Sequence, residues 1–138
     1  MTRAPIAALA TAVLLATLPA AGQDAPPAAY ALLVVLDVSG SMNEEVPGGI
    51  KRDLARRGLL RTFETLPRGT LAGLRLLGQG ATDDECAASQ ISVEFSPFVA
   101  SEWDAALDEV RWDGATPLVH SMRHALADLR QTNALRRE

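Results

Sequence analysis

Three oxygen-bearing side chains, those of Asp37, Ser39 and Ser41, follow an unbroken apolar run at positions 32–36. Such a run is typical of a strand that is covered on both faces, in the centre of a parallel sheet. Hard oxygen donors in the loop after a strand are the ligands that a hard divalent cation prefers. The carboxyl ends of the strands are also where open α/β sheets usually bind ligands. The sequence therefore predicts a metal-centred binding site in this loop.

A second motif, Asp-Gly-Ala-Thr-Pro-Leu, occupies residues 113–118, just before a predicted helix. The two motifs together resemble the metal-ion-dependent adhesion site of von Willebrand factor type A (VWA) domains. In that family, Asp-x-Ser-x-Ser after a hydrophobic strand is followed by a Thr in a Gly-x-Thr-Pro-Leu-like turn. The resemblance covers residues 30–138. No counterpart of the family's third metal-site residue, an Asp after a further strand, occurs before Glu138, so the resemblance implies an incomplete domain.

The resemblance implies roles for four residues. Ser39 and Ser41 would bind Mg²⁺ (or Mn²⁺ or Ca²⁺) directly, Asp37 would orient a bound water, and Thr116 would bind directly or through water. Mg²⁺ retains waters and near-octahedral geometry, so a Glu or Asp carboxylate of a protein partner could complete its shell. The implied function is cation-dependent adhesion without chemistry on the ligand, and the protein is not expected to be an enzyme.

Two other interpretations of the first motif remain open. Asp and Ser also favour helix caps and turns, so the cluster could be purely structural. Alternatively, Asp37 could accept a phosphoryl group, as in haloacid-dehalogenase-like phosphatases, although those need a second Asp where this chain has Ser39. The serine-hydrolase motifs Gly-x-Ser-x-Gly and Ser-x-x-Lys do not occur around either serine.

The amino-terminal composition predicts export. Residues 1–22 have a basic start, an apolar core and a small-residue end, which is typical of a cleaved secretory signal, and residues 23–29 form a linker. The alternative, a retained membrane anchor, is disfavoured because the apolar core falls short of the roughly 20 residues that span a bilayer. A net charge of −4 argues against nucleic acid or an anionic membrane as partner. We therefore expect a periplasmic or extracellular protein that does not insert into a membrane after cleavage.

The remaining pattern predicts an α/β fold with a Rossmann-like doubly wound sheet, of which three strands and three helices are present. The resemblance implies that this sheet is of the VWA type. The strand order is expected to be 3-2-1. Residues 43–49 are expected to form a loop and residues 101–104 a capping box. The last helix should bury a stripe of Leu118, Met122, Ala125 and Leu129. The other predicted elements are a helix over 50–66, strands over 70–77 and 90–95, a short helix that follows the capping box, and a final helix over 117–131.

Three further features carry weaker signals. The acidic residues 83–85 lie beside Cys86, the single cysteine of the chain, and we interpret them as a solvated cluster rather than as a wall of the ligand surface. His120 and His124 have the spacing of a zinc-binding helix, but Ser121 stands where the zinc-protease motif needs Glu, so surface positions are expected. The two tryptophans are expected to anchor the core or a turn.

Overall fold

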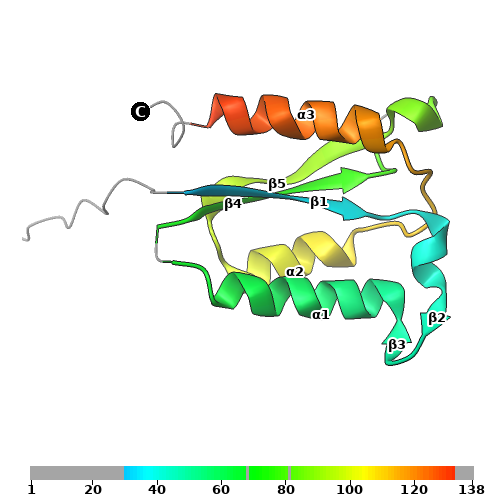
Figure 1. Cartoon of the computed structure of the whole chain (residues 1–138), viewed down its shortest axis with the longest axis horizontal. Coiled ribbons are helices and arrows are strands. Elements are labelled where there is room, and N and C mark those ends of the chain that lie inside the picture. Colours follow the sequence, from blue (N-terminus) through cyan, green and yellow to red (C-terminus); the bar gives the residue numbers. More distant parts are fainter. Residues whose placement is uncertain (1–29, 68, 81, 133–138) are drawn as a thin grey trace, which may run out of the picture.

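The computed structural model describes residues 30–67, 69–80 and 82–132; the predicted signal peptide and linker lie outside these ranges. The chain forms a sheet with helices on both of its faces (Figure 1). In chain order the elements are β1 (Ala31–Asp37), the 3-10 helix η1 (Gly40–Asn43), β2 (Glu45–Val46), β3 (Gly49–Ile50), α1 (Lys51–Glu64), β4 (Leu71–Leu77), the 3-10 helix η2 (Glu85–Ala87), β5 (Ser89–Pro97), α2 (Ala100–Asp108) and α3 (Leu118–Gln131).

The main sheet has the order β1-β4-β5, which confirms the predicted order of its strands. β1 and β4 are parallel, with Ala31 opposite Leu71 and Asp37 opposite Leu77, whereas β5 is antiparallel to β4. Because β1 and β4 are parallel and in register, the loops that follow them leave the same edge of the sheet. Among the described residues β4 is the central strand and β1 has one free edge, so the central position expected for β1 is wrong, while helices lie on both faces of the sheet (Figure 1).

The main core lies between the sheet and the pair α1 and α2, on one side of the sheet (Figure 1). Trp103 of α2 is fully buried, and its ring centroid lies 4.3 Å from that of Phe63 on α1. Phe98, which precedes α2, completes this aromatic cluster, with its ring centroid 5.7 Å from that of Trp103. Trp112 packs against the edge of the same core. Both tryptophans are thus anchors of the packing, as predicted.

The buried face of α3 differs from the prediction. The helix lies across the other side of the sheet (Figure 1), and its buried residues are Ser121 and Ala125. Of the predicted stripe, Ala125 is buried as expected and Leu129 is half-buried, whereas Leu118 and Met122 are 56% and 52% exposed. Small side chains let a helix approach a sheet closely. α3 therefore turns four of its large apolar side chains, Leu118, Val119, Met122 and Leu126, away from the sheet.

A buried ion pair also joins α3 to the sheet. Arg75, in the middle of β4, donates from Nε to Asp128 Oδ2 at 2.7 Å and from a terminal nitrogen to Ser89 Oγ at 3.1 Å. The Arg75 side chain is only 7% exposed, so its charge depends on these partners. Removal of one partner of a buried ion pair is strongly destabilising because the other charge remains uncompensated.

We therefore expect Asp128→Asn to lower the free energy of unfolding by about 3 kcal/mol, near the low end for buried pairs because Asp128 itself is partly exposed. Urea unfolding followed by circular dichroism measures this. Asp104→Asn, in an exposed ion pair, is the matched control and should cost less than about 1 kcal/mol. Equal costs for the two variants would contradict a special role for the buried pair.

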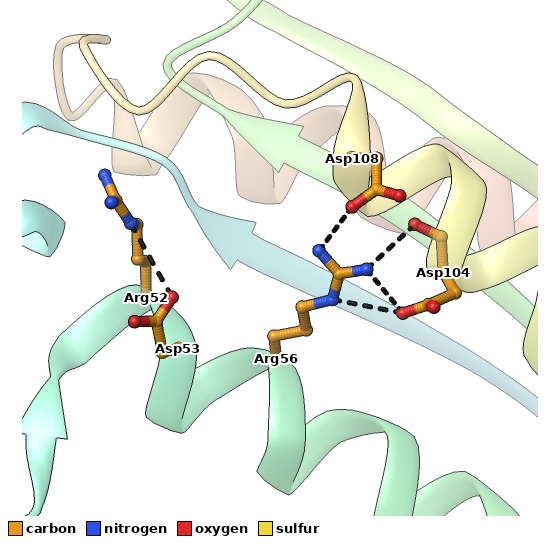
Figure 2. Close-up of polar contacts among 5 residues, drawn as sticks. All are labelled: Arg52, Asp53, Arg56, Asp104 and Asp108. Carbon is orange, nitrogen blue, oxygen red and sulfur yellow. Dashed lines mark hydrogen bonds and ion pairs between the residues drawn. The ribbon is translucent and has the colours of Figure 1, made fainter.

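The control residue belongs to a surface network between α1 and α2. Arg56 of α1 reaches Asp104 at 2.5 Å and Asp108 at 2.6 Å, both on α2 (Figure 2). The hydrogen bonds to Asp108 and Asp104 raise the pKa of Arg56. Arg52 and Asp53, also drawn in Figure 2, make a looser pair at 3.7 Å one turn earlier. The network holds the two helices of this layer in register at its solvent edge.

Two local predictions are wrong. The predicted loop over 43–49 contains the short antiparallel pair β2 and β3, in which Gly48 and Gly49 adopt positive φ at the turn. The predicted capping box does not form, because α2 begins at Ala100 with Val99 as its N-cap and no side-chain cap. The helix that follows still buries Trp103 and Leu107, so the error is confined to its first turn.

No helix among the described residues is long and apolar enough to cross a membrane.

Candidate metal site

The loop after β1 gathers the three side chains of the first motif. Asp37 ends β1, and its Oδ1 accepts a hydrogen bond from the backbone N–H of Ser39 at 2.8 Å. The chain then turns into η1, which brings the hydroxyls of Ser39 and Ser41 to 3.1 Å from each other. Ser39 is buried, Asp37 is half-buried and Ser41 is exposed. The cluster is therefore open to solvent on the Ser41 side.

The donor set fits a small divalent cation. Adjacent oxygens in an octahedral Mg²⁺ shell, with bonds of about 2.1 Å, lie about 3 Å apart. The two serine hydroxyls are hydrogen-bonded to each other at 3.1 Å, and this separation also matches two adjacent positions of such a shell. Asp37 uses Oδ1 to fix the loop, and Oδ2 accepts no hydrogen bond from any described residue. That oxygen is available to a metal-bound water.

The second motif lies directly beside the first. Gly114 pairs with Ser39 in an isolated parallel bridge, in which Gly40 N donates to Gly114 O and Gly114 N donates to Val38 O, each at 3.2 Å. Figure 1 shows the segment before α3 passing the end of β1. Thr116 follows two residues later and is exposed. Its hydroxyl makes no hydrogen bond to the other three candidates within the described residues. The fold thus joins the two motifs through backbone, with Thr116 at the rim.

Two residues outside the motifs build this arrangement. A side chain at Gly78, which has φ of +100° after β4, would collide with the carbonyl of Ala115, so the loop after β4 and the second motif touch through their backbones. Asn43 ends η1 and donates from Nδ2 to the carbonyls of Trp112 at 2.5 Å and Gly40 at 3.2 Å. Neither role was predicted from the sequence. A glycine directly after a strand was the available signal for the first.

The acidic loop, Cys86 and the two histidines lie near the same edge of the sheet as the candidate site. The acidic loop leaves β4 beside the candidate site, because β1 and β4 are parallel, and Asp84 caps η2 by accepting from Cys86 N at 2.9 Å. Cys86 is an exposed free thiol. The rings of His120 and His124 lie 4.5 Å apart on α3. Across the described residues, no three His, Cys, Asp or Glu side chains form a metal-binding group.

One curated protein resembles the chain in sequence. An uncharacterised protein of Bacillus subtilis (strain 168), YwmD, is 30% identical over 104 residues, which are 71% of this chain and 45% of YwmD. The chain thus spans about half the length of this relative. No protein-family model matches the chain.

The fold resembles those of several solved structures, one of which is a VWA domain. The VWA domain of SpRpn10 superimposes with a TM-score of 0.56 and 14% identity, over 75% of this chain and 52% of that one. An uncharacterised membrane-spanning protein of Vibrio fischeri superimposes with a TM-score of 0.58 and 17% identity, over 75% of this chain and 50% of that one. At these identities the likeness establishes the fold. The chain has a VWA-like α/β architecture, as predicted.

Proposed function

We propose that the protein is a divalent-cation-dependent protein-binding module of an exported protein. Ser39 and Ser41 would bind Mg²⁺, or Mn²⁺ or Ca²⁺ in its place, directly. Asp37 would hold a metal-bound water, and Thr116 would approach from the rim directly or through water. The observation that carries the proposal is the 3.1 Å separation of the two serine hydroxyls beside an available carboxylate oxygen.

The partner in this proposal is a protein that supplies a Glu or Asp carboxylate. A cation held by two neutral hydroxyls keeps most of its charge, and so favours an anionic oxygen as its next ligand. The exposure of Ser41 and Thr116 leaves that side of the cluster open to a partner. Ligand recognition through the cation needs no proton transfer or nucleophile, so catalysis is not part of the proposal.

The location in the proposal is the cell envelope or beyond it, either the periplasm or the extracellular space. It depends on the predicted signal over residues 1–22, which is outside the described residues. The Vibrio fischeri neighbour, described as membrane-spanning, supports an envelope setting.

Selection of displayed random octapeptides, in 5 mM Mg²⁺ and in EDTA, tests the proposal. We expect peptides that contain Asp or Glu to be enriched in Mg²⁺ at least tenfold over EDTA, as a chelator-sensitive bridge requires. Enrichment that is equal in Mg²⁺ and EDTA would contradict the proposal. Treatment with acetyl phosphate, followed by mass spectrometry, tests the alternative, because a phosphorylated Asp37 would indicate the phosphatase-like chemistry.

A further inference from the structure

The two candidate serine ligands are held by different parts of the fold. Ser39 is fixed on both sides, because its N–H donates to Asp37 and its backbone pairs with Gly114 in the parallel bridge. Ser41 lies inside η1, a four-residue helix that begins without a side-chain cap among the described residues. The bridge therefore fixes Ser39 relative to the second motif, but it does not by itself fix Ser41.

The side chain of Asn43, at the end of η1, reaches across to the second motif. Its Nδ2 donates to the carbonyl of Trp112 at 2.5 Å and to that of Gly40 at 3.2 Å. Trp112 directly precedes the second motif, and Gly40 is the first residue of η1. Within the described residues, this is the one side-chain hydrogen bond between η1 and the segment that carries Thr116. One amide group thus joins both ends of η1 to the second motif.

The oxygen of the same amide group is held by α1. Arg52, in the first turn of α1 (Figure 2), donates from a terminal nitrogen to Asn43 Oδ1. An amide offers donors on its nitrogen and acceptors on its oxygen, so partners on both sides set its orientation. Lys51 adds a second link nearby, with its Nζ 2.6 Å from Glu44 Oε2 and its N–H donating to Glu44 O at 3.1 Å. The start of α1 therefore holds the end of η1 through two adjacent residues.

The rigidity of this junction affects which cation fits the candidate site. Mg²⁺ needs near-ideal octahedral geometry with bonds of about 2.0–2.1 Å, whereas Ca²⁺ accepts flexible arrangements with bonds of about 2.3–2.6 Å. A site whose ligands are held at fixed separations therefore favours Mg²⁺, and a looser site loses that preference. The separation of 3.1 Å between the hydroxyls of Ser39 and Ser41 suits the smaller ion.

We propose that Asn43 is a positioning residue that fixes η1 against the second motif, and that it thereby gives the site a preference for Mg²⁺ over Ca²⁺. The inference rests on the proposed function, which places a cation at Ser39, Ser41 and Thr116. Asn43 acts through the backbone, because its oxygen is used by Arg52 and its nitrogen by two carbonyls. Its loss would leave Ser41 beside Ser39 but would remove the side-chain restraint between η1 and the segment of Thr116.

Amide hydrogen exchange of the metal-free protein, measured by NMR, tests the link itself. The amides of Gly40 and Gly114 report on the junction, because they donate to Gly114 O and Val38 O, each at 3.2 Å. Asn43→Ala should speed the exchange of both about three- to tenfold, as the loss of roughly one net hydrogen bond predicts. Asn43→Asp keeps the size of the side chain but has no N–H for the carbonyl of Trp112, so it should speed both as well.

Calorimetric titrations with Mg²⁺ and with Ca²⁺ test the consequence for the site. Asn43→Ala should weaken Mg²⁺ binding about tenfold, the lower cost of losing a group that orients metal ligands. It should weaken binding of the more adaptable Ca²⁺ by less than about threefold. Thr65→Ala is the matched control, because it removes an exposed hydroxyl that donates to a backbone carbonyl, that of Thr62, at the far end of α1. The control should change neither the affinities nor the exchange at the two glycines.

The two measurements separate the inference from the proposed function. Unchanged exchange at Gly40 and Gly114 in both Asn43 variants would overturn the link, whatever the titrations show. Faster exchange with equal losses of affinity for the two cations would overturn the role in selectivity and leave the proposed function standing. Failure of the wild-type protein to bind either cation would contradict the proposed function and the selectivity with it, while the exchange rates would still decide whether Asn43 joins the two motifs.

Discussion

Asp37→Asn should lower the affinity for Mg²⁺ by about 10–100-fold, the usual cost of losing a group that orients the ligands of a metal. The substitution removes a negative charge at the oxygen that would hold a metal-bound water. It keeps an oxygen that can accept the N–H of Ser39, so the turn after β1 should survive. The loss should therefore appear in metal affinity rather than in folding. Isothermal titration calorimetry, with circular dichroism as a check of the fold, measures it.

Glu64→Gln is the matched control for this prediction. Glu64 is an exposed carboxylate at the end of α1, away from the loop after β1 (Figure 1). Its neutralisation changes the net charge by the same amount, and so accounts for any non-specific attraction of the cation. Equal losses of affinity in the two variants would mean that Asp37 has no specific role.

Trp103→Ala should lower the free energy of unfolding by about 3–5 kcal/mol, the range for removal of a large buried aromatic side chain. Trp103 is fully buried and contacts both Phe63 and Phe98, so its loss would leave a cavity between α1, α2 and the sheet. A loss of this size is a large fraction of the stability of a typical domain. Urea unfolding followed by circular dichroism measures it.

Trp103→Phe separates the packing of the ring from its polar group. The indole Nε1 is buried and has no hydrogen-bond partner among the described residues. Phe removes that unsatisfied donor while keeping much of the ring, so it should cost well under half as much as Ala. A cost for Phe as large as that for Ala would show that the packing account of this position is wrong.

The sequence pattern was sufficient for the sheet order, and the resemblance to VWA domains was needed to pair the two motifs. Hydrophobic runs identified β1 and β4. The pairing of the two motifs was implied by the resemblance to VWA domains, because the second motif lies between α2 and α3 and follows no strand of the sheet. In the structure, the Ser39–Gly114 bridge joins the two motifs through their backbones. Whether the site binds a cation is a chemical question, and it stays a prediction.

Other features depend on tertiary packing that no local pattern encodes. The face of α3 that packs on the sheet is chosen by the small residues Ser121 and Ala125 and by the partner that Asp128 gives to Arg75, not by the largest apolar side chains. The capping box over residues 101–104 was displaced because the chain already turns into α2 at Ala100. The hairpin of β2 and β3 is too short for a period of two to be recognised.

The most direct test of the central claim is a Mg²⁺ titration of the protein followed by two-dimensional amide NMR. We expect saturable shifts in two separate stretches, residues 37–43 and residues 114–116, with one dissociation constant, since the bridge between Ser39 and Gly114 joins them. Addition of EDTA should reverse both. Shifts confined to the acidic residues 83–85, or shifts that rise linearly without saturation, would contradict a metal site at Asp37, Ser39, Ser41 and Thr116.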